Sequence, residues 1–272
     1  MQLLGKSLIA LGALSAGLLS STLPAAAAVP PGAGTTCTNP HWSTSGPGGG
    51  RSGPGIIHVG DSPYILDNDM WNATGNDVSQ TLNVCSHGSW YVDDTIPADT
   101  STAVKTYPNA HVDYINWVTG VSPLLSSYHK ITSSYAGQGP RSGIYEFAYD
   151  VWLNGFGSGH NEVMIWTQNH GQTPGGALVA SDVKISGLSW DLYASSDNGY
   201  IAFVPSNGRA YPSGTLDLTA FFDYLIQGGH VSSTSTLSQI GYGIEVVSTG
   251  GGTVRYNVTN FQVSPTHPAI EG

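Results

Sequence analysis

The chain has 272 residues and a formal net charge of −10, with 8 Lys and Arg against 18 Asp and Glu. So few basic residues exclude nucleic acid and other polyanions as natural partners. Charged residues make up only 10% of the chain, which also holds 36 Gly and 14 Tyr. This composition is typical of extracellular β proteins that meet a neutral ligand, such as a polysaccharide, through hydroxyl groups and aromatic rings.

The first 28 residues have the pattern of an export signal. Lys6 supplies the positive charge, residues 8–19 form a short apolar stretch, and three alanines at 26–28 make a small-residue cleavage site. The apolar stretch is too short for a membrane span and is interrupted by Gly12 and Gly17. We therefore expect a secreted protein that does not associate with a membrane.

Residues 29–55 are rich in glycine and proline, which predicts an irregular N-terminal segment. The chain has two cysteines, Cys37 and Cys85, and disulfides persist in exported proteins, so we expect one bridge between them. Two free thiols are the alternative. Neither the cysteines nor the histidines have the spacing of a metal site, so we expect no metal.

Between residues 56 and 264, short β-branched and aromatic runs recur at close intervals, separated by Gly, Pro, Asn and Asp. Such a pattern is typical of a β-sandwich or jelly roll. We expect one all-β domain built from two curved antiparallel sheets, followed by a polar tail at 265–272. The predicted strands are 56–59, 64–66, 89–92, 144–153, 162–167, 177–185, 189–194, 200–204, 241–247 and 254–263.

One segment, 217–227, has helical periodicity instead. Its apolar residues recur at intervals of three and four, Asp217 stands at its start, and two glycines follow its end. The sequence therefore predicts one amphipathic helix packed on the sandwich.

Glutamate is rare in this sequence, which has only Glu146, Glu162, Glu245 and Glu271. Two of these, Glu162 and Glu245, lie inside apolar strand-like runs, where burying a carboxylate is costly. A pair of such carboxyl groups among aromatic residues suggests acid/base and nucleophilic chemistry on a sugar. We expect Glu146 to be a solvated residue at the rim and Glu271, in the tail, to be inert.

Strand alternation predicts which side chains share a face. It directs Asp150, Glu162 and Glu245 to one concave surface, while their immediate neighbours point into the core. The same face should carry Trp152, Met164 and Trp166, which could contact sugar rings. We therefore expect these residues to line a substrate cleft.

The runs Tyr149-Asp150-Val151-Trp152-Leu153 and Glu162-Val163-Met164-Ile165-Trp166, followed by the helix and Gly243-Ile244-Glu245, resemble glycoside hydrolase family 12. This family comprises secreted jelly-roll endoglucanases and includes xyloglucan-active members. The resemblance implies that Glu162 is the nucleophile and Glu245 the acid/base of a retaining mechanism without a cofactor. It also implies that Asp150 hydrogen-bonds the nucleophile and that Trp71 stacks on a sugar.

The leading hypothesis is a monomeric, secreted, retaining endo-β-1,4-glucanase that acts on cellulose-like or mixed-linkage β-glucan. Three alternatives remain open: a xyloglucan-specific endoglucanase of the same family, a member of the related jelly-roll xylanase family, and a non-catalytic carbohydrate-binding jelly roll.

Overall fold

A computed structural model describes residues 34–266 of the chain. The predicted signal peptide, and most of the predicted C-terminal tail, lie outside the described residues.

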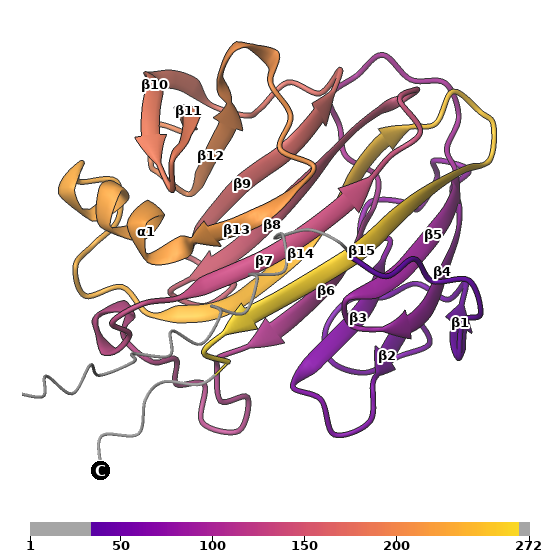
Figure 1. Cartoon of the computed structure of the whole chain (residues 1–272), viewed down its shortest axis with the longest axis horizontal. Coiled ribbons are helices and arrows are strands. Elements are labelled where there is room, and N and C mark those ends of the chain that lie inside the picture. Colours follow the sequence, from indigo (N-terminus) through magenta and orange to yellow (C-terminus); the bar gives the residue numbers. More distant parts are fainter. Residues whose placement is uncertain (1–33, 267–272) are drawn as a thin grey trace, which may run out of the picture.

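Two sheets make up the fold (Figure 1). The smaller sheet has six strands, and each neighbouring pair in it is antiparallel. In spatial order its strands are β1 (Trp42–Thr44), β4 (Ser79–Ser86), β5 (Ser89–Thr95), β15 (Val254–Ser264), β7 (Thr132–Gln138) and β13 (Ser213–Asp217).

The larger sheet has nine strands, and one of its pairings is parallel, between β12 and β9. Its strands are, in spatial order, β10 (Ala177–Ile185), β11 (Leu188–Ala194), β12 (Tyr200–Pro205), β9 (Asn161–His170), β8 (Ile144–Leu153), β14 (Leu237–Ser248), β6 (Tyr107–Asp113), β3 (Tyr64–Asp69) and β2 (Ile56–His58). Two short 3₁₀ helices, Leu125–Ser127 and Ser206–Gly208, lie in the connections. The central strands β9, β8 and β14 are the ones that position the candidate site.

The core lies between the two sheets and follows the predicted alternation. On β8, Phe147, Tyr149 and Val151 are fully buried in the main apolar cluster, and on β9 Val163 and Ile165 join them. A second, smaller cluster lies on the other face of the large sheet and contains Ala148, Met164, Trp166 and Ala202. The two clusters show that the large sheet is packed on one face and floors a concave surface on the other. The predicted β-jelly-roll sandwich is confirmed.

The predicted helix is present as α1 (Leu218–Gln227). It buries Leu218, Phe221, Phe222 and Leu225 toward the sandwich, as its apolar periodicity requires. It begins after Asp217, whose carboxylate pairs with Lys130 at 3.3 Å rather than capping the helix. Figure 1 shows α1 beside the end of β13.

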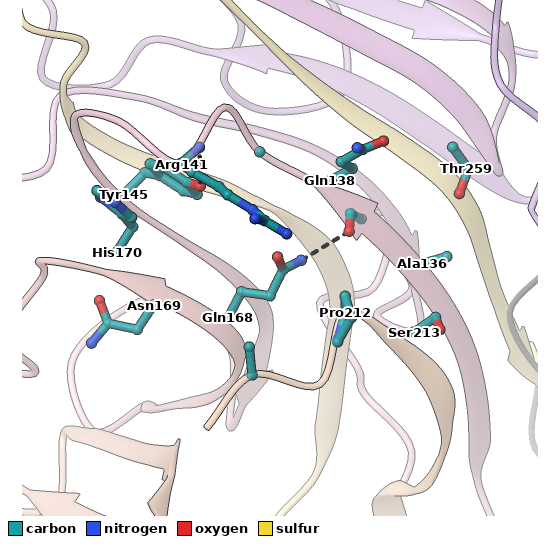
Figure 2. Close-up of a pocket in the computed structure, with 13 residues that line it drawn as sticks. Ala136, Gln138, Arg141, Tyr145, Gln168, Asn169, His170, Pro212, Ser213 and Thr259 are labelled. Atoms are coloured by element: carbon teal, nitrogen blue, oxygen red, sulfur yellow. Dashed lines mark hydrogen bonds between the residues drawn. The ribbon is translucent and has the colours of Figure 1, made fainter. Parts of the chain in front are cut away.

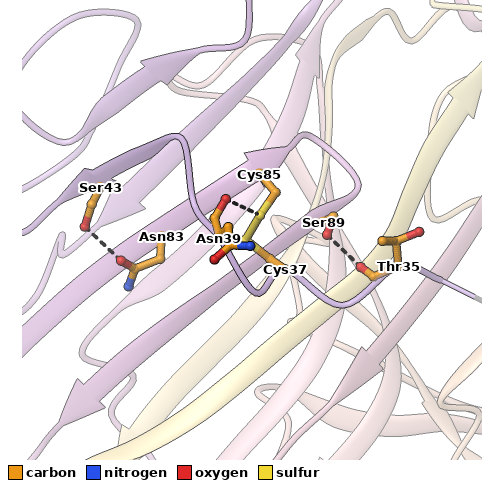
Figure 3. The surroundings of a disulfide bond; sticks show 7 residues. All are labelled: Thr35, Cys37, Asn39, Ser43, Asn83, Cys85 and Ser89. Carbon is orange, nitrogen blue, oxygen red and sulfur yellow. Dashed lines mark hydrogen bonds between the residues drawn. A yellow bond between two sulfur atoms is a disulfide. The ribbon is translucent and has the colours of Figure 1, made fainter.

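The expected bridge joins Cys37 to Cys85, which lies on β4 (Figure 3). Hydrogen bonds support it on both sides: Ser89 Oγ donates to the carbonyl of Thr35 at 2.6 Å, and Ser43 Oγ donates to Asn83 at 2.8 Å. The segment predicted to be irregular thus also contains the edge strand β1. The bridge and these bonds attach the N-terminal segment to the smaller sheet.

Candidate active site

The concave face of the large sheet brings the predicted acidic residues together. Glu162 on β9 is paired in register with Trp152 on β8, and Glu245 on β14 is paired with Glu146 on β8. Asp150 lies between these two positions, on the same face of β8. The three central strands therefore carry a row of carboxyl groups across one surface.

Glu162 is half-buried, and its environment favours the protonated form. Burial is the main cause that raises its pKa to about 7, and repulsion by the carboxylate of Glu245 adds to it. Glu162 and Glu245 thus lie on the two strands that flank β8, and each acts on the charge of the other.

Glu245 is also half-buried, and burial raises its pKa. Across the cleft stands Asp69, at the end of β3, whose carboxylate accepts a hydrogen bond from the backbone N–H of Trp71 at 3.1 Å. Burial and the charge of Glu245 together raise the pKa of Asp69 to about 6, although the bond from Trp71 opposes this. Asp69 is thus a further carboxyl group of the site that sequence reasoning missed.

Asp150 is 8% exposed, and one of its oxygens accepts a hydrogen bond from the indole N–H of Trp152 at 2.7 Å. Its other oxygen, Oδ1, is buried and has no hydrogen-bond partner among residues 34–266. Burial, followed by repulsion from Glu162 and from Glu245, raises the pKa of Asp150 well above its usual value. A neutral Asp150 has a proton to donate toward these two glutamates.

The predicted sugar-contacting side chains differ in exposure. Met164 and Trp166 are each 1% exposed and belong to the apolar cluster beneath the cleft, which leaves no ring face for a sugar. Trp152 is half-buried beside Asp150, whereas Trp71 is 63% exposed. Of the four, Trp152 and Trp71 have surface available for contact.

The expectation that Glu146 is a solvated rim residue is wrong. Its side chain is 0% exposed, and β8 is flanked at this point by β9 and β14. Alternation predicts the face of a strand residue but not its depth, and Glu146 lies in the middle of the sheet rather than at its edge.

A cavity of about 320 Å³ adjoins Asp150 and Trp152. The Gly-rich N-terminal segment forms one of its walls: the backbone N–H of Gly49 donates to both carboxylate oxygens of Asp67, at 3.0 and 3.2 Å. The cavity is lined further by Asp69, Tyr107, Asn109, His111, Trp117, Phe156 and Gln239. This mixture of rings and polar groups suits a sugar, which presents both CH faces and hydroxyls.

A larger cavity, of about 530 Å³, opens elsewhere, between β7 and the end of β9 (Figure 2). Gln168 crosses it and donates to the backbone carbonyl of Gly137 at 2.9 Å. Arg141 and His170 also line it, but none of the clustered carboxyl groups does. Size alone therefore does not identify the site, and the carboxyl row on the concave face is the better candidate.

The model of the family described as glycosyl hydrolase family 12 matches residues 62–265. The chain belongs to glycosyl hydrolase family 12. It is therefore a glycoside hydrolase, and family 12 is the family that the motifs around Glu162 and Glu245 predicted. The match spans both strands of the carboxyl row and the helix between them.

Curated relatives of this family 12 chain carry two kinds of name. Endoglucanase S of Pectobacterium parmentieri is 28% identical over 76% of this chain and 83% of its own length. Xyloglucan-specific endo-β-1,4-glucanase A of Aspergillus niger is 29% identical over 74% of this chain and 85% of its own.

Solved family 12 structures support the fold. A xyloglucanase from Bacillus licheniformis has a TM-score of 0.68 at 24% identity, covering 82% of this chain and 99% of that one. Endoglucanase Cel12A of Rhodothermus marinus has a TM-score of 0.66 at 24% identity, covering 82% and 97%.

Within residues 34–266, no group of three or more His, Cys, Asp or Glu side chains has the arrangement of a metal site. Over the same residues, no helix is long and apolar enough to cross a membrane.

Proposed function

We propose that this chain is a secreted, retaining endo-β-1,4-glucanase that hydrolyses internal bonds of cellulose-like or mixed-linkage β-glucan. The observation that supports the proposal is the presence of two half-buried glutamates, Glu162 and Glu245, on the two strands that flank β8 in the large sheet. Each has a raised pKa, and the proximity of the other contributes to that of Glu162. A retaining glycosidase needs two such carboxyl groups close together, one ionised and one protonated.

In the first step, the carboxylate of Glu162 attacks the anomeric carbon while the carboxylic acid of Glu245 gives its proton to the departing glycosidic oxygen. In the second step, the Glu245 carboxylate takes a proton from water, whose oxygen displaces Glu162 and restores the anomeric configuration. Burial of Glu245 supports its first role, since a raised pKa keeps an acid protonated near neutrality. No cofactor takes part in either step.

The surrounding residues have supporting roles in this proposal. Asp150, kept neutral by its neighbours, donates its proton toward Glu162 and so fixes the orientation of the nucleophile. Trp71 and Trp152 offer rings to the sugar, while Met164 and Trp166 form the rigid apolar floor beneath Glu162.

A xyloglucan-specific endoglucanase is the second candidate, because relatives of similar identity bear that name. The jelly-roll xylanase and the non-catalytic binding module are set aside, since the family match spans both candidate glutamates.

The test measures reducing-end release from carboxymethylcellulose, barley β-glucan, xyloglucan and xylan. We expect Glu162→Gln to lower glucan cleavage by at least about 10³-fold, because the covalent step is lost. Glu245→Gln should lower it by about 10²–10⁴-fold, because proton transfer is lost. The control variant Asp223→Asn, on the exposed side of α1, removes a carboxylate far from the cleft and should retain wild-type activity. Near-normal turnover in either glutamate variant would sink the proposal.

Azide then assigns the two roles. With an activated aryl β-cellobioside, Glu162→Ala should yield the α-glycosyl azide, because azide takes the place of the missing nucleophile. Glu245→Ala should yield the β-glycosyl azide, because azide attacks the covalent intermediate. The opposite products would exchange the roles of the two residues.

Secretion is proposed from the first 28 residues. It is tested by N-terminal sequencing of protein recovered from the culture medium of a host that expresses the full chain. A first residue near position 29 is the expected result.

A further inference from the structure

Glu146 is a third glutamate that the proposed reaction does not use, yet it faces one that the reaction does. It is the register partner of Glu245, on the adjacent strand and on the same face of the sheet. Directly opposed side chains in an antiparallel pair have Cβ atoms about 4.5–5.5 Å apart. Two glutamates in this arrangement can bring their carboxyl groups into contact.

The surroundings of Glu146 give its carboxyl group no other partner. Among residues 34–266, no donor reaches either of its two buried oxygens, and the carboxyl of Glu245, its register partner, is the neighbouring group that acts on its pKa. Its neighbour on the opposite side, Asn169, is engaged elsewhere: its amide donates to the carbonyl of Gln172, and its own carbonyl accepts from the N–H of that residue.

Within the part of the chain that the structure describes, no ion pair joins either glutamate to a basic residue. Lys105, which precedes β6, is buried, but its ammonium group bonds to Asp99 at 3.0 Å and to the carbonyl of Ala103 at 2.8 Å. Two buried carboxylates in contact without a cation cannot both be ionised, so the pair must hold at least one proton. Replacing Glu146 with a leucine of similar size would remove a costly buried group, so its presence calls for an explanation.

We infer that Glu146 is a positioning residue, which shares a proton with Glu245 and thereby sets the pH at which Glu245 ceases to act as an acid. The inference rests on the proposed function, in which Glu245 is the acid/base. Glu146 touches neither the sugar nor the water in this scheme and acts only through Glu245.

During the first step Glu245 loses its proton to the leaving oxygen and becomes an anion in a partly dry site. The O–H of neutral Glu146 donates a hydrogen bond to that anion and stabilises it. In the second step Glu245 regains a proton from water, while Glu146 keeps its own throughout. Consistent with this assignment, burial is the main cause that raises the pKa of Glu146, whereas the bond from Glu146 lowers that of Glu245.

Burial and the bond from Glu146 change the pKa of Glu245 in opposite directions. Burial favours the protonated form of Glu245, and the bond from Glu146 opposes this effect. The other titratable groups whose pKa values respond to Glu245 are Asp150 on β8, Glu162 on β9, Tyr200 on β12, Tyr107 on β6 and Asp69 on β3.

The test compares the pH dependence of kcat/KM on barley β-glucan for the wild type, Glu146→Leu and Glu146→Gln. Leucine removes the donor, so the basic limb should move upward by about one to two pH units, the size expected for a lost hydrogen bond to a charged group. Glutamine keeps an N–H donor and should leave the limb within about half a unit of wild type. Equal positions of the limb in the leucine variant and the wild type would overturn the inference, and so would equal shifts in the two variants.

A matched control is Asp94→Asn, which neutralises a fully buried carboxyl group on β5 of the other sheet. It should leave the pH profile unchanged even if it alters stability. An equal shift in this variant would attribute the effect to a general change in the fold and contradict the role of Glu146.

A second measurement uses an aryl β-cellobioside with a very acidic phenol, whose departure needs no proton. The basic limb of its glycosylation step does not depend on Glu245, so Glu146→Leu should match the wild type there. A shift that persists on this substrate would show that Glu146 does not act through Glu245.

Failure of the inference and failure of the proposed function give different results. If Glu245→Gln retains full activity, the proposed function fails. If Glu245→Gln is inactive and Glu146→Leu has a wild-type profile, only the role of Glu146 fails.

Discussion

At the scale of single residues, Asp150 supports the sharpest prediction. Its Oδ2 is held by the indole of Trp152, which leaves the buried Oδ1 as the atom able to carry a proton toward Glu162. Asp150→Ala should lower kcat on barley β-glucan by about 10–100-fold, the usual cost of losing a group that orients a reacting side chain. Asp150→Asn keeps a donor at this position and should lose less. Equal losses in the two variants, in steady-state kinetics on one substrate, would contradict a donor role.

Prediction from the sequence succeeded for the sheet face on which each side chain lies, because period-two alternation determines that face. Glu162, Glu245 and Asp150 lie on the face that alternation assigns them, because the residue after Glu162 and both residues that flank Glu245 and Asp150 are apolar and buried in the core. It failed for Glu146, and it missed that Trp166 is covered. Depth in a sheet depends on which strands lie alongside and on what covers them, and a local pattern carries no such information.

At the scale of elements, the Gly-rich segment 45–55 is irregular surface chain, as predicted, and it also lines the cavity beside Asp150. A Cβ on Gly48 would lie 1.6 Å from Asp67 Oδ1, so only glycine lets the segment approach this closely. Arg51 secures the segment through an ion pair with Asp113 at 3.1 Å and lies over the ring of Trp117, 5.9 Å from its centroid. That ring stacks in turn on Phe156, with centroids 5.4 Å apart.

Arg51→Leu should therefore affect long substrates more than short ones. We expect KM for cellohexaose to rise by about 2–5-fold, which corresponds to the loss of a contact worth about 0.5–1 kcal/mol. Hydrolysis of an aryl β-cellobioside should stay within about twofold of wild type, since that substrate is too short to need the far wall of the cavity. Identical KM values of variant and wild type for cellohexaose would show that the segment does not border the bound chain.

The success of strand prediction depends on the residue types in each strand. The β8 and β10 ranges agree with the structure, because their β-branched and aromatic content is high. β1, β4, β6, β7 and β13 were not predicted; β7 is mostly small polar residues and β6 contains a proline. β7 is a strand because its partner is far along the chain, where Phe261 of β15 pairs with Tyr135.

At the scale of the whole molecule, the concave surface concentrates acidic groups in a chain already rich in them. Within residues 34–266, six ion pairs form between basic and acidic side chains, and none of them involves Asp69, Asp150, Glu162 or Glu245. Several carboxyl groups of the folded protein are therefore partly protonated near neutral pH, which suits a neutral substrate. Their protonation also makes the free energy of unfolding depend on pH.

The free energy of unfolding should fall as the pH rises from about 4 to about 8. Burial raises the pKa of Asp94 to about 7, that of Asp67 to about 8 and that of Glu162 to about 7. Unfolded aspartate and glutamate titrate near pH 4, so in this window the folded chain binds more protons than the unfolded chain. Each of these groups contributes its full stabilisation at pH values below the pKa that it has in the unfolded chain. This contribution decreases as the pH rises toward the pKa of the group in the folded chain, by at most about 1.4 kcal/mol per group and pH unit.

Asp94 lets this effect be separated from catalysis, because it lies on β5 of the smaller sheet, where Thr106 Oγ1 donates to it at 3.5 Å. Asp94→Asn removes its titration and should flatten the decline of Tm between pH 5 and 8, measured by calorimetry in buffers of equal ionic strength. Asp223→Asn, which removes an exposed carboxylate, should leave the slope unchanged. Two results would contradict this prediction: a Tm that rises over this pH range in the wild type, or equal slopes in the wild type and Asp94→Asn. Either would mean that the buried carboxyl groups are ionised in the folded protein.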